Sequence, residues 1–405
     1  MAYLNRELIR ASDSPSIDAF GRWRTSVPFT VFDSKLVSDK GALFYDEEVN
    51  GTATSSHNTG DASVSMDVSA NADYVVRQTF QRFNYQPGKS QEIILTGVLG
   101  APVTDTVSRI GYFNSASTGD FSTSYDGIYI ESNGTELCWC IGKSGVINSA
   151  AQSSWSIDTM DGSGPSGITL DFDKTQIFFI DFEWLGVGRV RCGFVVDGLI
   201  YYAHEFLHAN NTTGVYMSSP NHSVRYEIRS TGGTKTMKQI CSSVLSEGGV
   251  DPSGVTRGIS MTSAQTVGTT FEGLIGFRLK STNLCSSVSI ANFTSVITSA
   301  NDDVAIAVLR NPTYANTPTW NSAGTSSAVE FAIGGGANTV SDNGDSLGFY
   351  FASSAANIIN NDPSVVINPG VAIDGTRDEF WLAARSTSGS ADVAAAINIS
   401  EQTCG

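Results

Sequence analysis

The sequence predicts an all-β protein in which two β-sandwich domains follow an extended N-terminal arm. Short apolar or alternating segments recur along the chain and are separated by turn-forming residues. Glycine, serine, threonine and asparagine are abundant, and the 405-residue chain has no heptad repeat. We assign residues 1–40 to the arm, residues 41–250 to the first domain and residues 251–405 to the second.

Three segments predict strands in the first domain. Residues 91–100 (QEIILTGVLG) form a clear strand pattern. Residues 126–142 predict a hairpin, because Asn133-Gly134 supplies the two positive-φ residues that a type I′ turn needs. Residues 175–184 (TQIFFIDFEW) alternate, so one face should carry Phe178, Ile180, Phe182 and Trp184, and Asp181 and Glu183 should point to the other.

The best-defined hairpin joins residues 188–196 to residues 199–206 through Asp197-Gly198, a second type I′ signal. A regular ladder places His204 on the outer face and Leu199 in the core. Hairpins of this kind favour a two-sheet jelly roll, and this one resembles concanavalin-like lectin folds. The register predicts five pairs: Val196–Leu199, Phe194–Tyr201, Cys192–Ala203, Arg191–His204 and Arg189–Phe206.

Residues 246–257 (SEGGVDPSGVTR) are rich in glycine and serine, and we take them as the linker between the domains. The segments beyond them predict a second all-β domain that extends to about residue 400. Its strand-like segments are FEGLIGFRLK, VAIAVLRNP, SAVEFAIGG, SLGFYFASS, EFWLAARS and VAAAINIS.

The formal net charge is −16, and basic residues form no long run. This charge argues against a protein that coats nucleic acid, because phosphate binding needs clustered lysine and arginine. No apolar run reaches the roughly 18 residues of a spanning helix, and the N-terminus lacks the apolar region of a signal peptide. We therefore expect neither nucleic-acid binding nor membrane insertion.

The six cysteines form no CxxC pair. Cys138 and Cys140 should share one face of a strand, and Cys192 resembles a small core residue. We expect mostly free thiols, as is usual for a protein that folds in a reducing cytoplasm.

The N-terminal arm is unusually rich in large aromatic and basic side chains. Between Ser14 and Lys35, glycine, proline and hydroxyl residues interrupt any regular helix. An irregular segment of this composition is typical of an interface anchor, so we expect it to bind a partner protein. The candidate contact residues are Phe20, Arg22, Trp23, Arg24, Phe29 and Phe32.

The arm also carries a family resemblance. Its DAFGRWRTS and PFTVFDSK motifs (residues 18–26 and 28–35) resemble the start of a family of tailed-bacteriophage virion proteins that is common in marine phages. The resemblance covers most of the chain in scattered blocks and implies a virion structural protein. The later blocks are GFVVDGLIYYAHEFLHAN, VYMSSPNHSVRYEIRSTGG, QICSSVLSEGG, GLIGFRLKS and AVLRNPT.

The segment His204-Glu-Phe-Leu-His208 matches the H-E-x-x-H pattern of zinc proteases. On a helix it would place two imidazoles one turn apart, with Glu205 as the base. On a strand, positions i and i+4 lie about 13 Å apart, too far to share one zinc ion. Because the segment follows a hairpin turn, we expect no metal at His204 and His208.

No other pattern indicates an enzyme or a cofactor. The acidic pairs, such as Asp171/Asp173, lack the spacing of a calcium loop and are more typical of solvated loops. The sequence has no G-x-S-x-G motif, and its GGG triplet is not followed by the residues of a phosphate loop. Aromatic residues at loop-like positions could stack on sugars, although partial burial in the core is commoner: Tyr85, Tyr112, Trp155, Tyr216 and Trp320.

Three functions remain open from the sequence. The resemblance favours a non-enzymatic virion protein, an outer accessory subunit of the decoration or fibre type, which is assembled in the host cytoplasm and docks to the capsid or tail through its arm. The resemblance also favours a homo-oligomer, a trimer above all. The first alternative is a tail protein that binds a host-surface receptor or glycan, and the second is a zinc-dependent hydrolase that uses the HEFLH motif.

Overall fold

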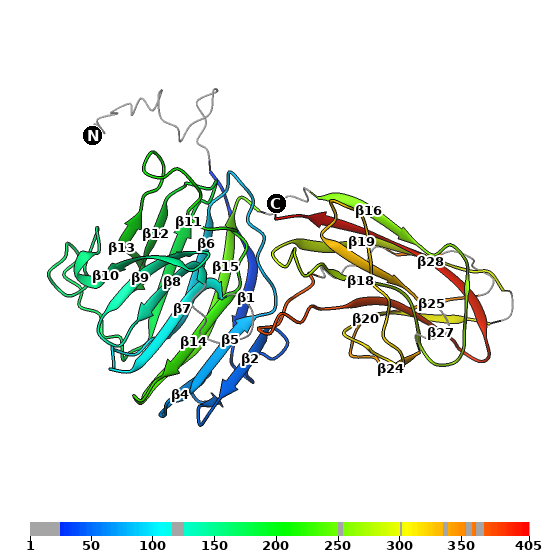
Figure 1. Cartoon of the computed structure of the whole chain (residues 1–405), viewed down its shortest axis with the longest axis horizontal. Helices are drawn as coiled ribbons and strands as arrows, with labels where there is room; N and C mark the ends of the chain where they lie inside the picture. Colours follow the sequence, from blue (N-terminus) through cyan, green and yellow to red (C-terminus); the bar gives the residue numbers. More distant parts are fainter. Residues whose placement is uncertain are drawn as a thin grey trace, which may run out of the picture.

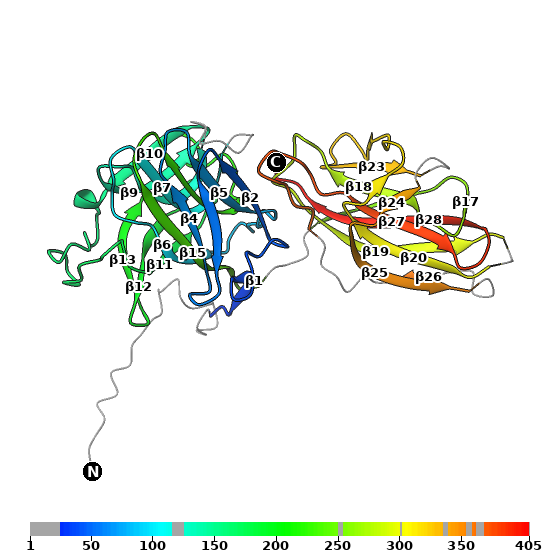
Figure 2. The same ribbon diagram turned by 90° about the horizontal axis from the view of Figure 1, so that it is seen from below.

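The computed structural model consists of two β-sandwiches that lie side by side along the longest axis of the molecule (Figures 1 and 2). It describes residues 25–115, 125–249, 254–299, 302–334, 339–353, 359–361 and 368–404. These residues form strands and one 3-10 turn, η1 (Gln152–Ser154), but no α-helix. The predicted all-β fold is confirmed. No described helix is long and apolar enough to cross a membrane.

The first sheet of the first sandwich has the order β13-β12-β11-β6-β15-β4-β3, with β1 paired to β15 beside β4. Every pair is antiparallel. Its eight described strands are β1 (Pro28–Lys35), β3 (Thr54–Asn58), β4 (Ser63–Val68), β6 (Gln91–Val98), β11 (Gln176–Phe182), β12 (Val190–Val196), β13 (Leu199–Phe206) and β15 (Lys235–Glu247).

The second sheet packs against the first and has the order β10-β9-β8-β7-β14-β5-β2. The core between the two sheets is made by alternate residues of their strands, as in β6, where every second side chain is buried. The seven described strands are β2 (Tyr45–Asn50), β5 (Tyr74–Thr79), β7 (Thr106–Ser115), β8 (Tyr125–Ser132), β9 (Leu137–Lys143), β10 (Val146–Ala151) and β14 (Val224–Ser230).

The hairpin predicted within residues 126–142 is confirmed, but its turn is different from the predicted one. Ser132 is the partner of Leu137, so four residues connect β8 and β9. The Asn133 side-chain oxygen accepts hydrogen bonds from the backbone N–H groups of Thr135 and Glu136, at 3.1 and 2.9 Å. The asparagine therefore stabilises a longer turn through its side chain, and a two-residue type I′ turn does not form.

The assignment of residues 1–40 to an irregular arm needs correction. Residues 28–35 form β1, which pairs with β15 from Pro28 opposite Glu247 to Lys35 opposite Cys241. Phe32 has only 8% of its surface exposed because its ring lies in the core, 5.0 Å from the ring of Phe83. The sequence also allows one short helix over residues 2–10, and this segment lies outside the described residues.

The second sandwich contains two larger sheets and a two-stranded ribbon, and its core lies between the larger sheets. Each of the strand-like segments predicted from the sequence contains a strand. The sheet β16-β28-β19-β26, with β17 beside β28, comprises β16 (Val255–Ser260), β17 (Gln265–Val267), β19 (Ser287–Ile297), β26 (Ile359–Asn361) and β28 (Ala391–Gln402). The sheet β22-β23-β18-β27-β20-β25 comprises β18 (Glu272–Leu279), β20 (Val304–Arg310), β22 (Asn321–Ser322), β23 (Val329–Ile333), β25 (Asp345–Ala352) and β27 (Phe380–Ser386). The ribbon pairs β21 (Thr313–Tyr314) with β24 (Val340–Asp342).

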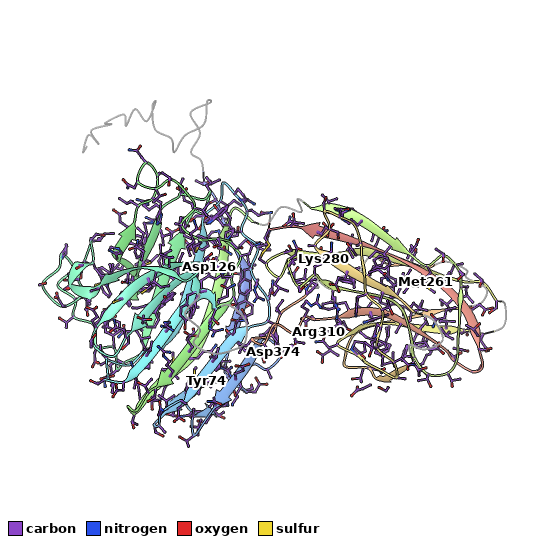
Figure 3. All side chains as sticks on the ribbon, viewed as in Figure 1. Tyr74, Asp126, Met261, Lys280, Arg310 and Asp374 are labelled. Atoms are coloured by element: carbon purple, nitrogen blue, oxygen red, sulfur yellow. A yellow bond between two sulfur atoms is a disulfide. The ribbon has the colours of Figure 1, made fainter. Side chains whose placement is uncertain are left out.

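A loop of the second sandwich reaches the first sandwich beside β2 and β5, at the point that Asp374 marks in Figure 3. The backbone N–H of Ile373 donates to the Asp46 carboxylate at 2.7 Å, and the Ile373 side chain packs on Val76. The N–H of Val371 donates to the carbonyl oxygen of Phe80 at 2.8 Å. Polar and apolar contacts together therefore connect the two sandwiches.

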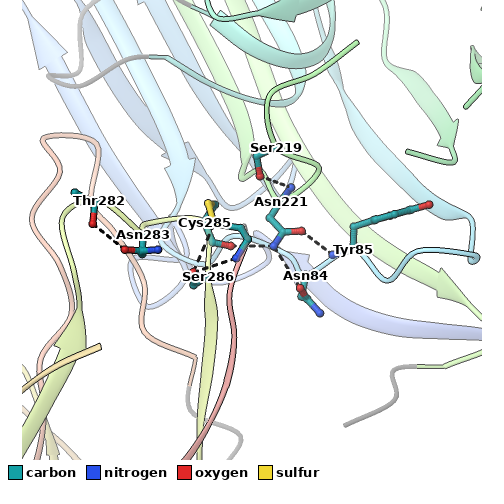
Figure 4. Close-up of a disulfide and its surroundings, with 9 residues drawn as sticks. Asn84, Tyr85, Ser219, Asn221, Thr282, Asn283, Cys285 and Ser286 are labelled. Carbon is teal, nitrogen blue, oxygen red and sulfur yellow. Dashed lines mark hydrogen bonds between the residues drawn. A yellow bond between two sulfur atoms is a disulfide. The ribbon is translucent and has the colours of Figure 1, made fainter. Parts of the chain in front are cut away.

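A second connection centres on the buried side chain of Asn221 (Figure 4). Its oxygen accepts from the N–H of Tyr85 at 2.8 Å, and its amide nitrogen donates to the carbonyl oxygen of Cys285 at 2.9 Å. Cys285 forms a disulfide with Cys404, so the expectation of mostly free thiols holds for four cysteines and is wrong for this pair. No local pattern indicates the pairing, because 119 residues separate the two cysteines.

The burial of Phe32 leads to a test of β1. Phe32→Ala removes a core ring and should lower the free energy of unfolding by about 3–5 kcal/mol. Phe29→Ala removes a half-exposed ring at the start of the same strand and should change it by no more than about 0.5 kcal/mol. Urea denaturation of both variants measures the difference. Equal effects would show that β1 does not dock as described.

Candidate functional site

The predicted docking residues divide into three groups. Phe20, Arg22, Trp23 and Arg24 lie outside the described residues. Phe29 is half-exposed at the start of β1 and remains a candidate contact. Phe32 is corrected: it packs in the core of its own domain, so it is not available to a partner.

The hairpin of the HEFLH motif has its predicted turn, but its register changes in the middle. Val196 faces Leu199 and Phe194 faces Tyr201, as predicted. A β-bulge then makes Ala203 an extra residue, so the remaining predicted pairs are wrong. The pairs that form instead are Cys192–His204, Arg191–Glu205 and Val190–Phe206.

Gly193 explains the bulge. A Cβ atom at this position would lie 2.2 Å from the carbonyl oxygen of Tyr201, so the two strands approach more closely than any other residue allows. From His204 onward, the bulge exchanges the side chains that face the core with those that face outward. His204 is therefore buried rather than exposed, and Glu205 points outward. Leu199, predicted in the core, is 60% exposed at the turn.

Both histidines of the motif have structural partners. His204 Nδ1 accepts a hydrogen bond from the backbone N–H of Ser156 at 3.1 Å, and the His208 ring stacks on Tyr216 with its Nδ1 2.8 Å from the carbonyl oxygen of Gly188. Burial lowers the pKa of both imidazoles. In the part of the chain that the structure describes, no three His, Cys, Asp or Glu side chains gather to hold a metal ion.

A buried ionic network lies on the face of the seven-stranded sheet that points away from the core. Strand pairing sets Arg109 directly between Glu227 of β14 and Glu131 of β8. Its guanidinium donates to Glu131 at 2.5 Å and to Glu227 at 2.7 Å, and Arg225 donates to the other oxygen of Glu227 at 2.7 Å. Although burial opposes its charge, the two carboxylates raise the pKa of Arg109. These carboxylates are held as salt-bridge partners of the arginines.

Aromatic rings and cysteines surround this network. The Arg109 guanidinium lies 4.3 Å from the centre of the Tyr125 ring, and the neighbouring Tyr129 ring is buried. Cys138 and Cys140 share this face, as predicted, and burial raises the pKa of both thiols. The thiols are therefore poor nucleophiles.

A second carboxylate pair lies on the outer face of the eight-stranded sheet. Glu92 of β6 is directly opposite Asp181 of β11. Burial, followed by the charges of Glu247 and Asp181, raises the pKa of Glu92. Asp181 itself forms an ion pair with Arg191 and accepts a hydrogen bond from Ser90. Glu92 could hold a proton, but its partner carboxylate is already engaged.

A polar cavity of about 720 Å³ opens where β4, β6 and β15 meet the loops after β6 and before β11. Threonine and serine hydroxyls line it together with several small apolar side chains, and we call it the lysine cavity because of the three lysines in its wall. Its lining residues are Asp61, Ser63, Val98, Gly100, Ala101, Val103, Asp173, Lys174, Thr175, Thr234, Lys235, Thr236, Lys238 and Ile240.

Lys235 is the unusual member of this set. Only 5% of its surface is exposed, and its ammonium donates to the Ser132 hydroxyl at 2.8 Å. Burial lowers the pKa of Lys235 to about 8, against the opposing pull of the Asp173 carboxylate. Among the described residues no carboxylate forms an ion pair with it, in contrast to Lys238, which lies 2.8 Å from Asp61.

No pattern in the sequence indicates this cavity. Asp173 was assigned to a solvated loop, and its carboxylate accepts a hydrogen bond from the N–H of Ala101 in the cavity wall. The lysines were not singled out, because Lys174 is about 60 positions from the other two and only the sheet order brings them together. The five loop-type aromatics proved partly or fully buried, in agreement with the commoner alternative: Tyr85, Tyr112, Trp155, Tyr216 and Trp320.

Comparison with known proteins gives similarity of fold alone. No family model matches the chain, and no curated protein matches it. Among solved structures, a Bacillus licheniformis β-glucanase is similar over 56% of this chain and all of its own, at 11% identity and a TM-score of 0.34. The Emp46p carbohydrate recognition domain in its metal-free form covers 54% of this chain and 96% of its own, at 9% identity and a TM-score of 0.33. A legume lectin-like domain from Entamoeba histolytica is similar over 49% of this chain and 89% of its own, at 8% identity and a TM-score of 0.28. These scores are low, so function has to be inferred from the side chains of this chain.

The ionic network leads to a prediction about stability. Glu227→Gln leaves Arg109 and Arg225 buried without their shared carboxylate and should lower the free energy of unfolding by about 3–5 kcal/mol. Glu205→Gln is the matched control, because Glu205 lies 3.7 Å from an exposed Arg189, and should change it by no more than about 0.5 kcal/mol. Chemical denaturation at neutral pH measures both. A Glu227→Gln variant as stable as the control would contradict a charged network.

The buried ammonium of Lys235 leads to a pH-dependent prediction. Its pKa is lower in the folded than in the unfolded chain, so the folded state loses this proton first and the wild type gains stability as pH rises above about 8. Lys235→Met lacks that gain. The stability of the variant relative to the wild type should therefore fall by about 2 kcal/mol between pH 7 and pH 10.

Thermal or urea unfolding at several pH values measures this trend. Thr236→Val, a neutral change on the same strand, controls for the general pH dependence of the protein. A constant difference between the Lys235→Met variant and the wild type would mean that the ammonium is not buried.

Proposed function

We propose that the chain is a non-enzymatic structural subunit of a tailed-phage virion, which docks onto a neighbouring virion protein through its N-terminal segment. The observation that carries this proposal is the exposed apolar surface where that segment joins the first sandwich. Val27 is 79% exposed and Phe29 is 50% exposed, directly after the residues that bear the resemblance to virion proteins. Large exposed apolar side chains of this kind typically mark a contact surface.

The backbone of β1 supports the same role. Within the described part of the chain β1 pairs with β15 alone, which leaves the N–H and C=O groups of its other edge available. An open strand edge can accept a strand from another protein, because the main chain supplies the hydrogen bonds and the side chains supply specificity. Phe20, Arg22, Trp23 and Arg24 would add aromatic and charged contacts next to this edge.

The state of the ionizable groups supports a structural rather than a catalytic role. Glu131 and Glu227 are bound to arginines, and the two histidines of the HEFLH motif are packed against neighbouring rings. A general acid or base needs a side chain that can reach a substrate and exchange a proton. In our proposal these groups stabilise the sandwich, and the protein assembles as a closed homotrimer, by analogy with the family.

Deleting residues 1–24 tests the proposal. The deletion ends before β1 begins at Pro28, so the two sandwiches should keep the unfolding temperature of the full chain. The truncated chain should be absent from density-purified phage particles that contain the full chain, as measured by mass spectrometry. Val27→Ser/Phe29→Ser should reduce incorporation, whereas Val146→Ser, which changes an equally exposed residue of β10, should not. A truncated chain that incorporates normally would rule out the docking role, and a full chain absent from particles would rule out the virion assignment.

A further inference from the structure

We propose that the lysine cavity binds an anionic saccharide, a sugar that bears carboxylate or sulfate groups. The proposal concerns a surface remote from the N-terminal docking segment, so it holds or fails independently of the virion role. It rests on three properties of the cavity: its charge, its hydroxyl-rich lining and its size.

The charge of the cavity is opposite to that of the protein. The chain carries a net charge of −16 and has only eight lysines, and three of them, Lys174, Lys235 and Lys238, line this one cavity. Two aspartates are also present, but Asp61 is paired with Lys238 and Asp173 accepts the hydrogen bond from Ala101. The cavity therefore presents a net positive charge, which an anion would complement.

Lys235 gives the cavity a buried cation that forms no ion pair among the described residues. Its ammonium is held by one hydroxyl, that of Ser132, although an ammonium can donate three hydrogen bonds. A buried charge is costly unless it is paired. An anionic group that enters the cavity would supply the missing partner, so part of the binding energy is the relief of this cost.

Gly100 holds the Lys235 side chain in place. A Cβ atom at position 100 would lie 2.6 Å from Cε of Lys235, so the glycine backbone forms a close wall along the lysine stem. This contact restricts the ammonium before any ligand arrives. A preorganised donor loses less conformational entropy on binding, which favours affinity.

The lining fits an anion that also carries hydroxyl groups, such as an acidic sugar, better than it fits phosphate or a nucleotide. The exposed hydroxyl groups of Thr175, Thr234 and Thr236 can exchange hydrogen bonds with sugar hydroxyls, and the apolar lining can contact the C–H face of a sugar ring. The volume of about 720 Å³ is far larger than one phosphate ion needs. None of the described lining residues is aromatic, so nothing there can stack on a nucleobase.

Isothermal titration calorimetry at low ionic strength tests the proposal on the full chain with four probes. These are trigalacturonate, a heparin-derived sulfated disaccharide, neutral maltotriose and inorganic phosphate. At least one of the two anionic saccharides should bind, and maltotriose and phosphate should bind at least tenfold more weakly. The choice between the two saccharides tells carboxylate from sulfate recognition.

Three variants locate the site. Lys174→Gln changes an exposed side chain that the fold does not need, and Lys235→Met removes the buried ammonium; each should weaken binding of the anionic saccharide at least tenfold. Lys143→Gln makes the same charge change on β9, outside the cavity, and should leave binding unchanged. The proposal is overturned if neither saccharide binds, if maltotriose or phosphate binds equally well, or if the cavity variants bind like the wild type.

Discussion

The pairing of β1 with β15 is the contact on which the arrangement of the first sandwich depends. β15 is 13 residues long, and it pairs with β6 along one edge and with β4 and β1, end to end, along the other. This pairing places Pro28 opposite Glu247. The N-terminal segment and the linker to the second sandwich therefore leave the first sandwich side by side. A segment that docks onto a partner would act next to the junction of the two sandwiches.

The two sandwiches are also connected in a way that a flexible linker alone would not provide. The loop around Ile373 combines a hydrogen bond to Asp46 with apolar packing on Val76. Asn221 bridges the first sandwich to the backbone of Cys285, beside the disulfide that fixes the end of the chain. Hydrogen bonds and side-chain contacts therefore hold the two sandwiches together at two separate places.

Buried charged side chains have different kinds of partner at two places in the first sandwich. On the seven-stranded sheet, Arg109 and Arg225 share the carboxylate of Glu227, so each charge has a partner within the chain. At the lysine cavity, Lys235 has a hydroxyl partner and forms no ion pair with a carboxylate among the described residues. The first arrangement is complete without a ligand, whereas the second is satisfied only in part. This difference is why the cavity, and not the ionic network, is the better candidate for binding.

The sequence alone predicts the all-β class, the existence of the hairpins and the strand segments of the second sandwich, because alternation and turn residues act over a few neighbouring positions. It did not determine the bulge at Gly193, although a glycine inside a strand pattern is the signal that could have indicated it. The burial of His204 and Phe32, the disulfide and the lysine cavity follow from the three-dimensional arrangement of the strands. Each of these depends on which strands become neighbours in a sheet, and contacts between residues far apart in the chain leave no local pattern.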